Sequence, residues 1–539
     1  MNKKALISCV ILSILTIGGI VALLIFGTKK INTPNDPYVG VKVVDFSNQD
    51  EKAYSDIETI TTGGVYRISG TYKKTIKISA NKNDVKLILD NVNIKTTNGP
   101  AIYVESADTV YIELVGDNKI VAETNDDLNG AIYSKDDLLL TGDGILTIES
   151  NLDGIVGKDD LQINSGTYNI TAQDDGIVGK DSLFIKDGIF NITSTGDGLK
   201  TSNENEQGIL TIDNGIYKIN SKGDGIASIA SLIISNGTFD ITSGDSTVNR
   251  NNNDKSMKGI KSKAELTIID GKINITSIDD SVHANKDVFI KGGKITCSSS
   301  DDGIRSDNNV IIKDGTITIN KSYEGIEGKN ITIDGGNIKV VSSDDGFNAS
   351  NGDGSSQGRP GTYTYKRNNS EDIPYITING GNVYINSTGD GIDSNGNILI
   401  TGGTTYVDGP TNNGNGPMDY GDFGNYKFEV TGGELIAVGA KGMAVAPTST
   451  NVTTVFINLD NAYKNDITIG DITYKPTKAY NSILICSDKL KQNRTYELKI
   501  ANETITSLTL NNVITTYGTT GNFGGPGGGD HGGGPGRGW

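Results

Sequence analysis

Aspartate stands beside glycine at regular intervals along this chain. Near-copies of one segment recur as NLDGIVGK (151–158), AQDDGIVGK (172–180), SSDDGIRSD (299–307), SSDDGFNAS (342–350) and STGDGIDSN (387–395). Carboxylates at related positions could bind a divalent cation, because Ca²⁺ prefers oxygen ligands and takes about 6–8 of them. Asp-Gly pairs also form tight turns, in which the aspartate accepts hydrogen bonds from backbone amides. Whether these aspartates bind a cation or cap turns depends on how the segments are arranged in space.

Two series of glycines predict that arrangement. The glycines of the D-G-I units lie 22 residues apart at Gly154, Gly176 and Gly198, and the interval returns at Gly259, Ser281, Gly303 and Gly325. A second series, which includes Gly166 and Gly188, has the same 22-residue interval. Its interval becomes longer wherever the interval of the first series becomes longer. Two markers in step over many units are typical of a solenoid.

Each unit contains three short runs of β-type residues separated by polar corners. In the unit that starts at Gly166 they are TYNITA, GIVG and LFIK, with apolar residues alternating with polar ones. Such coils bury their apolar face only by stacking on one another. We therefore predict an all-β fold, a right-handed parallel β-helix with three strands per coil over residues 45–450.

Stacking would bring the aspartates into one column at the inter-strand spacing of about 4.8 Å. The predicted column contains Asp153, Asp175, Asp197, Asp224, Asp280, Asp302, Glu324, Asp345 and Asp390, and the residues Asp174, Asp279, Asp301 and Asp344 precede four of them. Each unscreened pair of neighbours would cost about 1–3 kcal/mol. Shared Ca²⁺ ions would remove this repulsion, so we predict calcium ligands here, with the turn-capping role as the alternative.

A second predicted column lies beside the first, two residues after each marker glycine. Lys261, His283 and Arg305 occupy this position on three consecutive coils, and strand alternation turns them outward. The sequence predicts a cationic strip that binds an anionic polymer, with His283 at the surface and not acting as a catalyst. An ordinary solvated face is the alternative.

Composition narrows the class of partner. The 539 residues carry a net charge of -17, which argues against a nucleic-acid partner, since binding phosphates requires a basic surface. Cys9, Cys297 and Cys486 are the only cysteines, so no disulfide framework is expected.

The N-terminus predicts the location of the protein. Residues 5–26 contain no charged residue and follow Lys3 and Lys4, which favours a membrane span with its N-terminus inside. We favour an uncleaved signal anchor over 1–30, followed by a linker over 31–44, with a cleaved signal peptide as the alternative. Both interpretations place the rest of the chain outside the cytoplasm, with the membrane contacted only through this segment.

The region after Asn348 points to carbohydrate. Residues 349–374 form a polar insertion that carries Tyr363 and Tyr365, residue types that contact sugars from exposed loops. The following stretch, GDGIDSNGNILITGGTTYVDGPTNNGNGPMDYG (389–421), together with the preceding D-D-G-I coils and GELIAVGAKGMAVAP, resembles the calcium-binding carbohydrate-binding β-helix proteins of anaerobic plant-biomass bacteria. The resemblance covers about residues 45–515.

That resemblance implies several properties. It implies a pectate-lyase-like fold, a secreted protein and an acidic plant polysaccharide such as polygalacturonate as the partner. It also adds Asp390, Asp393 and Asp419 to the candidate Ca²⁺ ligands.

The C-terminal part contains no new catalytic motif. Residues 451–517 read as antiparallel strands that cap the open end of the solenoid, and 518–539 form a Gly-rich tail. We predict an extracellular Ca²⁺-dependent carbohydrate-binding protein. Two alternatives remain: a calcium-dependent polysaccharide lyase with Arg305 or Lys261 as its base, and a structural stalk or adhesin.

Overall fold

The computed structural model describes residues 41–42, 44–54, 59–203, 208–245, 255–351, 373–421 and 425–519. Within these ranges every regular element is a β-strand, which confirms the predicted all-β class. By its contacts the chain divides into two units, 1–42 and 43–539, and all strands lie in the second. Among the described residues there is no helix with the length and apolar character that crossing a bilayer requires. The predicted span at 5–26 lies outside the described residues.

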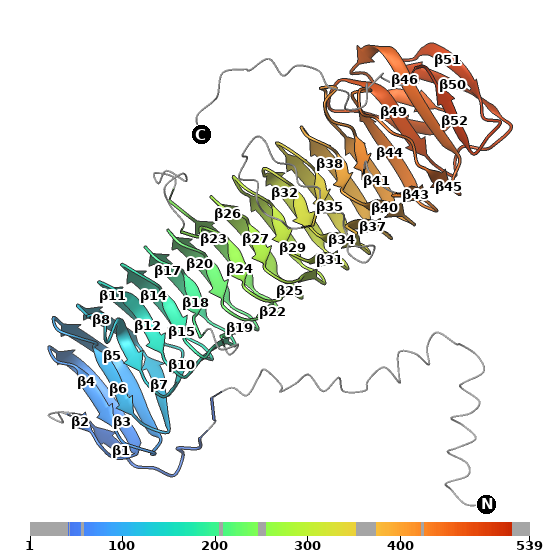
Figure 1. The fold of residues 1–539 in the computed structure, drawn as a ribbon. Coiled ribbons are helices and arrows are strands. Elements are labelled where there is room, and N and C mark those ends of the chain that lie inside the picture. Colours follow the sequence, from blue (N-terminus) through green and yellow to red (C-terminus); the bar gives the residue numbers. More distant parts are fainter. Residues whose placement is uncertain are drawn as a thin grey trace, which may run out of the picture. The chain divides into compact units, whose positions relative to one another are not determined.

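The strands stack into a solenoid built from two long sheets (Figure 1). One sheet has 15 strands, all parallel to their neighbours. These strands are β2 (Thr59–Ile60), β4 (Ile76–Ser79), β6 (Ile102–Ser106), β9 (Gly130–Ser134), β12 (Asp153–Gly157), β15 (Ile177–Gly179), β18 (Leu199–Thr201), β21 (Ile226–Ser228), β24 (Ile260–Ser262), β27 (Val282–Ala284), β30 (Ile304–Ser306), β33 (Ile326–Gly328), β36 (Phe347–Ala349), β39 (Ile392–Ser394) and β42 (Met418–Tyr420).

The second sheet has 33 strands and contains two parallel ladders. Strands β1 (Glu51–Ala53), β3 (Gly64–Tyr72) and β5 (Val85–Thr96) lead into both ladders. One ladder continues through β7 (Thr109–Val115), β10 (Asp137–Gly142), β13 (Asp160–Ile163), β16 (Ser182–Ile185), β19 (Ile209–Ile212), β22 (Leu232–Ile234), β25 (Leu266–Ile268), β28 (Val288–Ile290), β31 (Asn309–Ile312), β34 (Asn330–Ile333), β37 (Tyr375–Ile378), β40 (Asn397–Ile400), β43 (Phe428–Val430) and β45 (Ser449–Thr450).

The other ladder carries the longer strand of each repeat. It runs through β8 (Asp117–Ala122), β11 (Ile145–Ser150), β14 (Thr167–Ala172), β17 (Ile189–Ser194), β20 (Ile216–Ser221), β23 (Thr238–Ser243), β26 (Lys272–Ser277), β29 (Lys294–Ser298), β32 (Thr316–Lys321), β35 (Asn337–Ser342), β38 (Asn382–Ser387), β41 (Thr404–Asp408) and β44 (Glu434–Gly439). One repeat therefore passes through β12, β13 and β14, and the next stacks β15, β16 and β17 on them in register.

The two glycine series are required for different reasons. Gly166 has φ +115°, a conformation that L side chains rarely adopt. Gly176 allows close approach, because a Cβ there would lie 2.5 Å from the carbonyl oxygen of Gly198 in the next coil. One series thus makes the turn between the two ladders, and the other lets successive D-G-I corners stack.

The core is a column of side chains along the solenoid axis. Alternate residues of each strand point inward, and isoleucines such as Ile177, Ile226 and Ile304 are fully buried. Tyr168, Phe190, Tyr217 and Phe239 stack on successive coils with ring centroids 5.1, 4.8 and 4.5 Å apart. Cys297 and Cys486 are buried free thiols, so no disulfide joins them.

Antiparallel strands cover the C-terminal end of the solenoid. β49 (Tyr480–Cys486) pairs antiparallel with β44 and with β46 (Thr454–Tyr463), and β52 (Ile514–Tyr517) pairs with β46. A separate four-stranded sheet contains β47 (Ile467–Ile469), β48 (Ile472–Tyr474), β50 (Thr495–Ile500) and β51 (Glu503–Thr509). The last parallel strand therefore meets a strand of opposite direction, which closes an edge that would otherwise be open to further pairing.

Candidate functional site

The aspartates stack at one corner of the solenoid, immediately before the strands of the 15-stranded sheet. We call this row of residues the corner column. Its carboxylates accept hydrogen bonds from the backbone of the following coil: the Asp175 amide donates to Asp153 Oδ1 at 2.9 Å, and the Asp224 amide donates to Asp197 Oδ1 at 2.8 Å. The same bond joins Asp197 to Asp175, Lys258 to Asp224, Asp302 to Asp280, Glu324 to Asp302, Asp390 to Asp345 and Gly416 to Asp390. One carboxylate oxygen per residue therefore caps the backbone.

The corner column is not acidic throughout. Lys258 occupies the position between Asp224 and Asp280, because the Gly225 amide donates to the Lys258 carbonyl just as other glycines do to aspartates. The predicted column omitted this coil. The segment MKGIKSK, in which Lys-Gly-Ile stands for Asp-Gly-Ile, is the sequence signal that could have revealed it.

The second row lies on the outer face of the 15-stranded sheet, and we call it the outer row. Cα pairing between successive strands gives the order Lys200, Ala227, Lys261, His283, Arg305, Glu327, Asn348, Asp393 and Asp419. The inward neighbours of this row are buried, as strand alternation predicts. The two rows run side by side, and residues of the outer row contact the second carboxylate oxygen of Asp175, Asp197, Asp224, Asp280 and Asp302.

In the middle coils this second oxygen meets a cation. Lys200 Nζ lies 3.0 Å from Asp175 Oδ2 and 2.9 Å from Asp197 Oδ2. Burial alone would lower the pKa of Lys200, but these two carboxylates raise it. Lys261 Nζ lies 3.5 Å from Asp224 Oδ2 and donates a hydrogen bond to the Ser256 hydroxyl oxygen at 3.0 Å.

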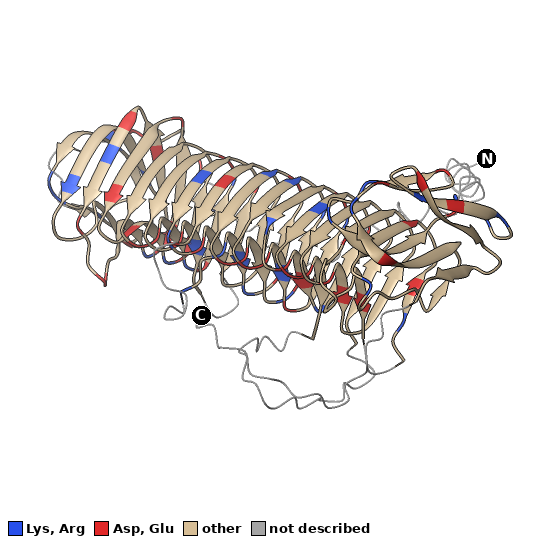
Figure 2. Cartoon of the chain, turned by 90° about the horizontal axis from the view of Figure 1, so that it is seen from above, with Lys and Arg blue, Asp and Glu red and all other residues tan. Residues whose placement is uncertain are grey.

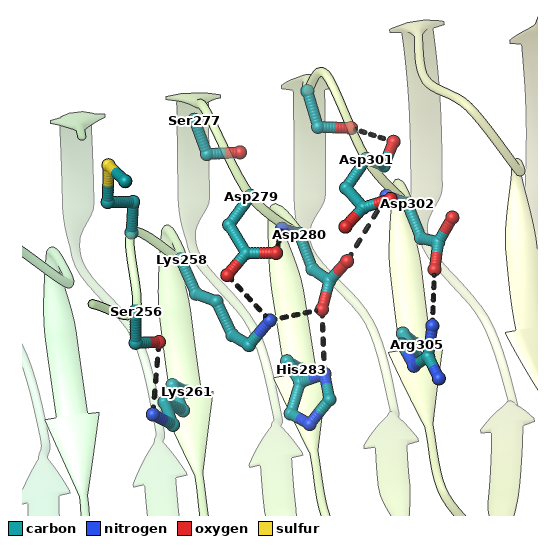
Figure 3. Close-up of polar contacts among 12 residues, drawn as sticks. Ser256, Lys258, Lys261, Ser277, Asp279, Asp280, His283, Asp301, Asp302 and Arg305 are labelled. Carbon is teal, nitrogen blue, oxygen red and sulfur yellow. Dashed lines mark hydrogen bonds and ion pairs between the residues drawn. The ribbon is translucent and has the colours of Figure 1, made fainter. Parts of the chain in front are cut away.

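The next coils hold a buried network around Asp280 (Figure 3). Lys258 Nζ contacts Asp279 Oδ2 at 2.9 Å and Asp280 Oδ2 at 2.6 Å, and His283 Nδ1 lies 2.8 Å from the same Asp280 oxygen. Burial opposes ionisation of Asp280, yet His283 and Lys258 together lower its pKa. His283 is 8% exposed, so the expectation of a surface histidine was wrong: the Asp280 carboxylate holds the ring against the corner column.

Arg305 is held between two carboxylates. Its Nη1 lies 3.0 Å from Asp302 Oδ2 and 2.7 Å from Glu327 Oε2. These groups raise the pKa of Arg305 despite its burial, and burial together with Asp280 and Glu327 raises the pKa of Asp302. A guanidinium held in its charged form is a poor general base. The geometry therefore gives little support to Arg305 as a lyase base.

Beyond Arg305 the two rows turn acidic. Carboxylate oxygens of Asp345, Asp390 and Asp393 lie within 4.8 Å of one another, and no lysine or arginine of the described residues forms an ion pair with them. Burial raises the pKa of Asp345 to about 6 and that of Asp390 to about 7. The pKa of Asp393 is raised well above its usual range by burial and by the neighbouring carboxylates. We call these three residues the acidic cluster.

A neutral oxygen stands next to the acidic cluster. Asn348 precedes Asp393 in the outer row, and its Nδ2 donates to both oxygens of Glu324 at 2.9 and 2.8 Å. Its Oδ1 is buried and has no hydrogen-bond partner. A buried acceptor without a donor is costly, and a cation would satisfy it. Glu324 itself has a pKa raised to about 8, chiefly by burial and Asp302.

Gly389 packs against Asp345 of the acidic cluster and against its neighbour Asp344. A Cβ at Gly389 would lie 2.4 Å from Asp344 Oδ1 and 2.3 Å from Asp345 Oδ1. Only glycine leaves these oxygens uncovered at this distance. Asp419 follows Asp393 in the outer row on β42, and its charge contributes to the raised pKa values of Asp390 and Asp393.

Other groups of carboxylates differ from the acidic cluster. Asp153, Asp174 and Asp175 gather at the N-terminal end of the corner column, where Asn129 and Lys200 contact them. Asp279, Asp280 and Asp301 form another group, in which the Lys258 ammonium contacts Asp279 and Asp280, and Asp302 and Glu324 gather with Glu327 beside Arg305. Asp197 and Asp224 belong to no such group within the described residues.

The sequence interpretation also missed one group and included residues that cannot be placed. Asp137, Asp159 and Asp160 come together at a different corner of the solenoid, outside the D-G-I units. Tyr363 and Tyr365 lie outside the described residues. Figure 2 shows the resulting distribution, with basic and acidic residues interspersed along one edge and acidic ones gathered toward the C-terminal strands.

Comparisons with known proteins identify the family of this chain. Residues 55–303 and 298–506 match the family model of carbohydrate-binding domain-containing proteins. A curated relative of that description from Acetivibrio thermocellus is 31% identical over 162 residues, which are 28% of this chain and 52% of the relative. The chain thus spans about half the length of that relative. A solved polysaccharide lyase-like protein from C. thermocellum, as its gadolinium derivative, is similar at 23% identity, covering 50% of this chain and 96% of that one, with a TM-score of 0.28.

Proposed function

Because the chain belongs to the family of carbohydrate-binding domain-containing proteins, we propose that it binds an acidic polysaccharide outside the cell in a calcium-dependent manner. Polygalacturonate is the polymer that we propose to test first. We also propose that the solenoid is a right-handed parallel β-helix with three strands per coil. The N-terminal apolar segment holds the protein at the membrane, or is removed to release it.

The acidic cluster is the observation that carries the proposal. Three carboxylates with raised pKa values gather there, and no lysine or arginine of the described residues forms an ion pair with them. Asn348, whose amide oxygen is buried and has no hydrogen-bond partner, precedes Asp393 in the outer row. Oxygen ligands of this kind suit Ca²⁺. Asp345, Asp390, Asp393 and Asn348 would hold the ion, with Asp344 and Asp419 nearby. An ion bound there would offset the repulsion between the carboxylates and could also accept a uronate carboxylate.

The middle coils are less suited to metal. Lys200, Lys258 and Arg305 already neutralise the carboxylates that face them. These side-chain cations are attached to the chain, so they neutralise a carboxylate without losing translational freedom, whereas a metal ion from solution loses it on binding. We therefore assign calcium to the acidic cluster and not to the central part of the corner column, where the turn-capping interpretation has the stronger support.

A binding titration with Ca²⁺ alone tests the metal site. The full chain should bind Ca²⁺, and Asp393→Asn should weaken binding at least tenfold. Asp240→Asn is the matched control, because Asp240 is an exposed aspartate on β23 of the other sheet. Equal affinity in all three proteins would contradict the assignment.

Co-sedimentation with polygalacturonate tests the carbohydrate partner and separates the alternatives. Binding should be stronger in Ca²⁺ than in chelator, and weaker for methyl-esterified polymer than for the free acid. The ultraviolet absorbance of unsaturated product should stay at the level of the buffer. Its appearance would favour a lyase, and the absence of any binding would favour a structural stalk.

A further inference from the structure

The outer row changes its chemistry along the 15-stranded sheet. Toward the N-terminus it continues from Lys200 through Val178, Val156, Tyr133 and Tyr103 to Lys77. Tyr133, Val156 and Val178 form a small apolar cluster outside the main core, with Tyr103 and Leu128 packed against it. The outer face of the N-terminal coils is therefore an aromatic and apolar surface in which Tyr133, Val156 and Val178 are buried and Tyr103 and Leu128 are partly exposed.

Three lysines border this surface, one on each of three consecutive coils. Lys135, Lys158 and Lys180 each follow the last residue of β9, β12 and β15. The Lys158 amide donates to the Ser134 carbonyl at 2.8 Å, and the Lys180 amide donates to the Gly157 carbonyl at 2.7 Å. The three backbones thus stack along the axis at the strand spacing of about 4.8 Å. We call these three residues the lysine row.

The lysine row differs from the cations of the middle coils in its partners. No carboxylate of the described residues forms an ion pair with any of the three, whereas Lys200, Lys261 and Arg305 each have one. Lys135 and Lys180 are exposed, and Lys158 is half-buried. No direct ion pair within the described residues therefore neutralises the lysine row, and the chain supplies only longer-range attraction, from Glu105 on Lys135 and from Asp153 on Lys158.

The tyrosines position two of these ammonium groups. Lys135 Nζ lies 5.7 Å from the ring centroid of Tyr103, and Lys158 Nζ lies 5.4 Å from that of Tyr133. Lys77 Nζ also lies over Tyr103, at 5.6 Å. Tyr133 is 5% exposed and so acts as a support, while Tyr103 is half-buried and offers part of its ring to a ligand. Burial and Lys180 lower the pKa of Lys158, a penalty that a bound anion would relieve.

We propose that the lysine row and Tyr103 form a second binding surface for a carboxylated polysaccharide, which lies along the solenoid axis over β6, β9, β12 and β15. Lysines on three consecutive coils fit a linear polymer with one carboxylate per sugar, and a tyrosine ring fits the apolar face of a sugar. This inference rests on the proposed function and extends it, since the lysine row lies many coils away from the acidic cluster and requires no metal.

The test uses two triple variants of the full chain. The first replaces the lysine row by Lys135→Gln, Lys158→Gln and Lys180→Gln. The control replaces three exposed lysines by glutamine: Lys218 on β20, and Lys186 and Lys291, which directly follow β16 and β28. Both variants therefore lose the same charge. Binding to polygalacturonate is measured in Ca²⁺, and the Ca²⁺-induced change in melting temperature is measured in parallel.

The expected result is specific to the first variant. Its affinity for polygalacturonate should fall at least tenfold, with an unchanged Ca²⁺-induced shift, and the control should bind like the original chain. Equal losses in both variants, or no loss in either, would overturn the proposal. So would equal binding of methyl-esterified polymer, because the lysine row would then not recognise carboxylates.

The outcomes separate this inference from the proposed function. If the original chain binds polygalacturonate and the first variant binds it equally well, only the second surface is refuted. If the original chain does not bind polygalacturonate in either Ca²⁺ or chelator, both proposals fail. Tyr103→Leu provides an independent check that keeps all charges and should weaken binding less than the triple replacement does.

Discussion

Lys258 Nζ lies 2.6 Å from Asp280 Oδ2, in a column where the neighbouring coils place carboxylates (Figure 3). The lysine takes the place of an aspartate and puts its ammonium between Asp279 and Asp280. A corner that could have gathered a metal ion is thus neutralised by the chain itself. Neighbouring coils reach the same result with Lys200 and Arg305 from the outer row.

Replacing Lys258 by methionine should show how much the chain gains from neutralising Asp279 and Asp280 with its own ammonium group. Removing one partner of a buried ion pair typically costs about 3–5 kcal/mol, because the remaining charge stays buried. We expect a lower melting temperature in chelator and a larger Ca²⁺-induced increase than in the original chain. Thermal denaturation with and without Ca²⁺ measures both. Lys263→Met, at an exposed position nearby, should change neither.

Replacing Asp197 should distinguish its two roles. Its Oδ1 accepts the Asp224 amide at 2.8 Å, and its Oδ2 contacts Lys200 at 2.9 Å. Asp197→Ala removes the acceptor and should lower the free energy of unfolding by about 1–3 kcal/mol. Asp197→Asn keeps the acceptor and should cost less. Urea denaturation measures the difference, and equal losses would show that the charge, not the cap, matters.

The effect of Ca²⁺ on stability should depend on pH. The pKa values of Asp345 and Asp390, about 6 and about 7, lie above their ordinary value, so between about pH 4 and pH 7 the folded chain binds more protons than the unfolded chain. Without metal, their contribution to the free energy of unfolding therefore decreases as pH rises through this range.

Calcium should reverse this trend, because it binds the ionised carboxylates. We expect a larger Ca²⁺-induced increase in melting temperature at about pH 8 than at about pH 5, where protons compete for the same oxygens. Differential scanning calorimetry at the two pH values measures this. An increase of the same size at both values would contradict the assignment of Ca²⁺ to the acidic cluster.

The stacked rings should carry a large share of local stability. Phe190 is fully buried between Tyr168 and Tyr217, at centroid distances of 5.1 and 4.8 Å. Phe190→Ala leaves a cavity and should cost about 3–5 kcal/mol, whereas Phe190→Leu should cost less. Chemical denaturation followed by circular dichroism measures both. A loss below about 1 kcal/mol for alanine would show that the coils close over the gap.

Much of the fold could be predicted from periodicity. Two glycine series in step indicated stacked coils, and alternation indicated which residues of each strand face the core. The register observed between β27 and β30 places His283 beside Arg305, as equal spacing from their marker positions predicted. These predictions succeeded because a solenoid relates sequence distance to spatial distance by one constant interval.

The site was predicted less completely. The sequence placed aspartates in a column but omitted Lys258, because the column was defined by carboxylates and this coil has lysine before its marker Gly259. It predicted that Lys261, His283 and Arg305 form a cationic strip beside the aspartates that binds an anionic polymer, and in the structure each contacts a carboxylate of the corner column. It did not identify the unsatisfied oxygen of Asn348 or the lysine row.

By itself, then, the sequence determined which residues share a row, since the repeat length fixes the coil and the position within it. Only the tertiary structure decided which charges are compensated. Compensation depends on how far each side chain reaches across the corner, and a few ångströms separate a carboxylate bound to a lysine from one left to a metal ion.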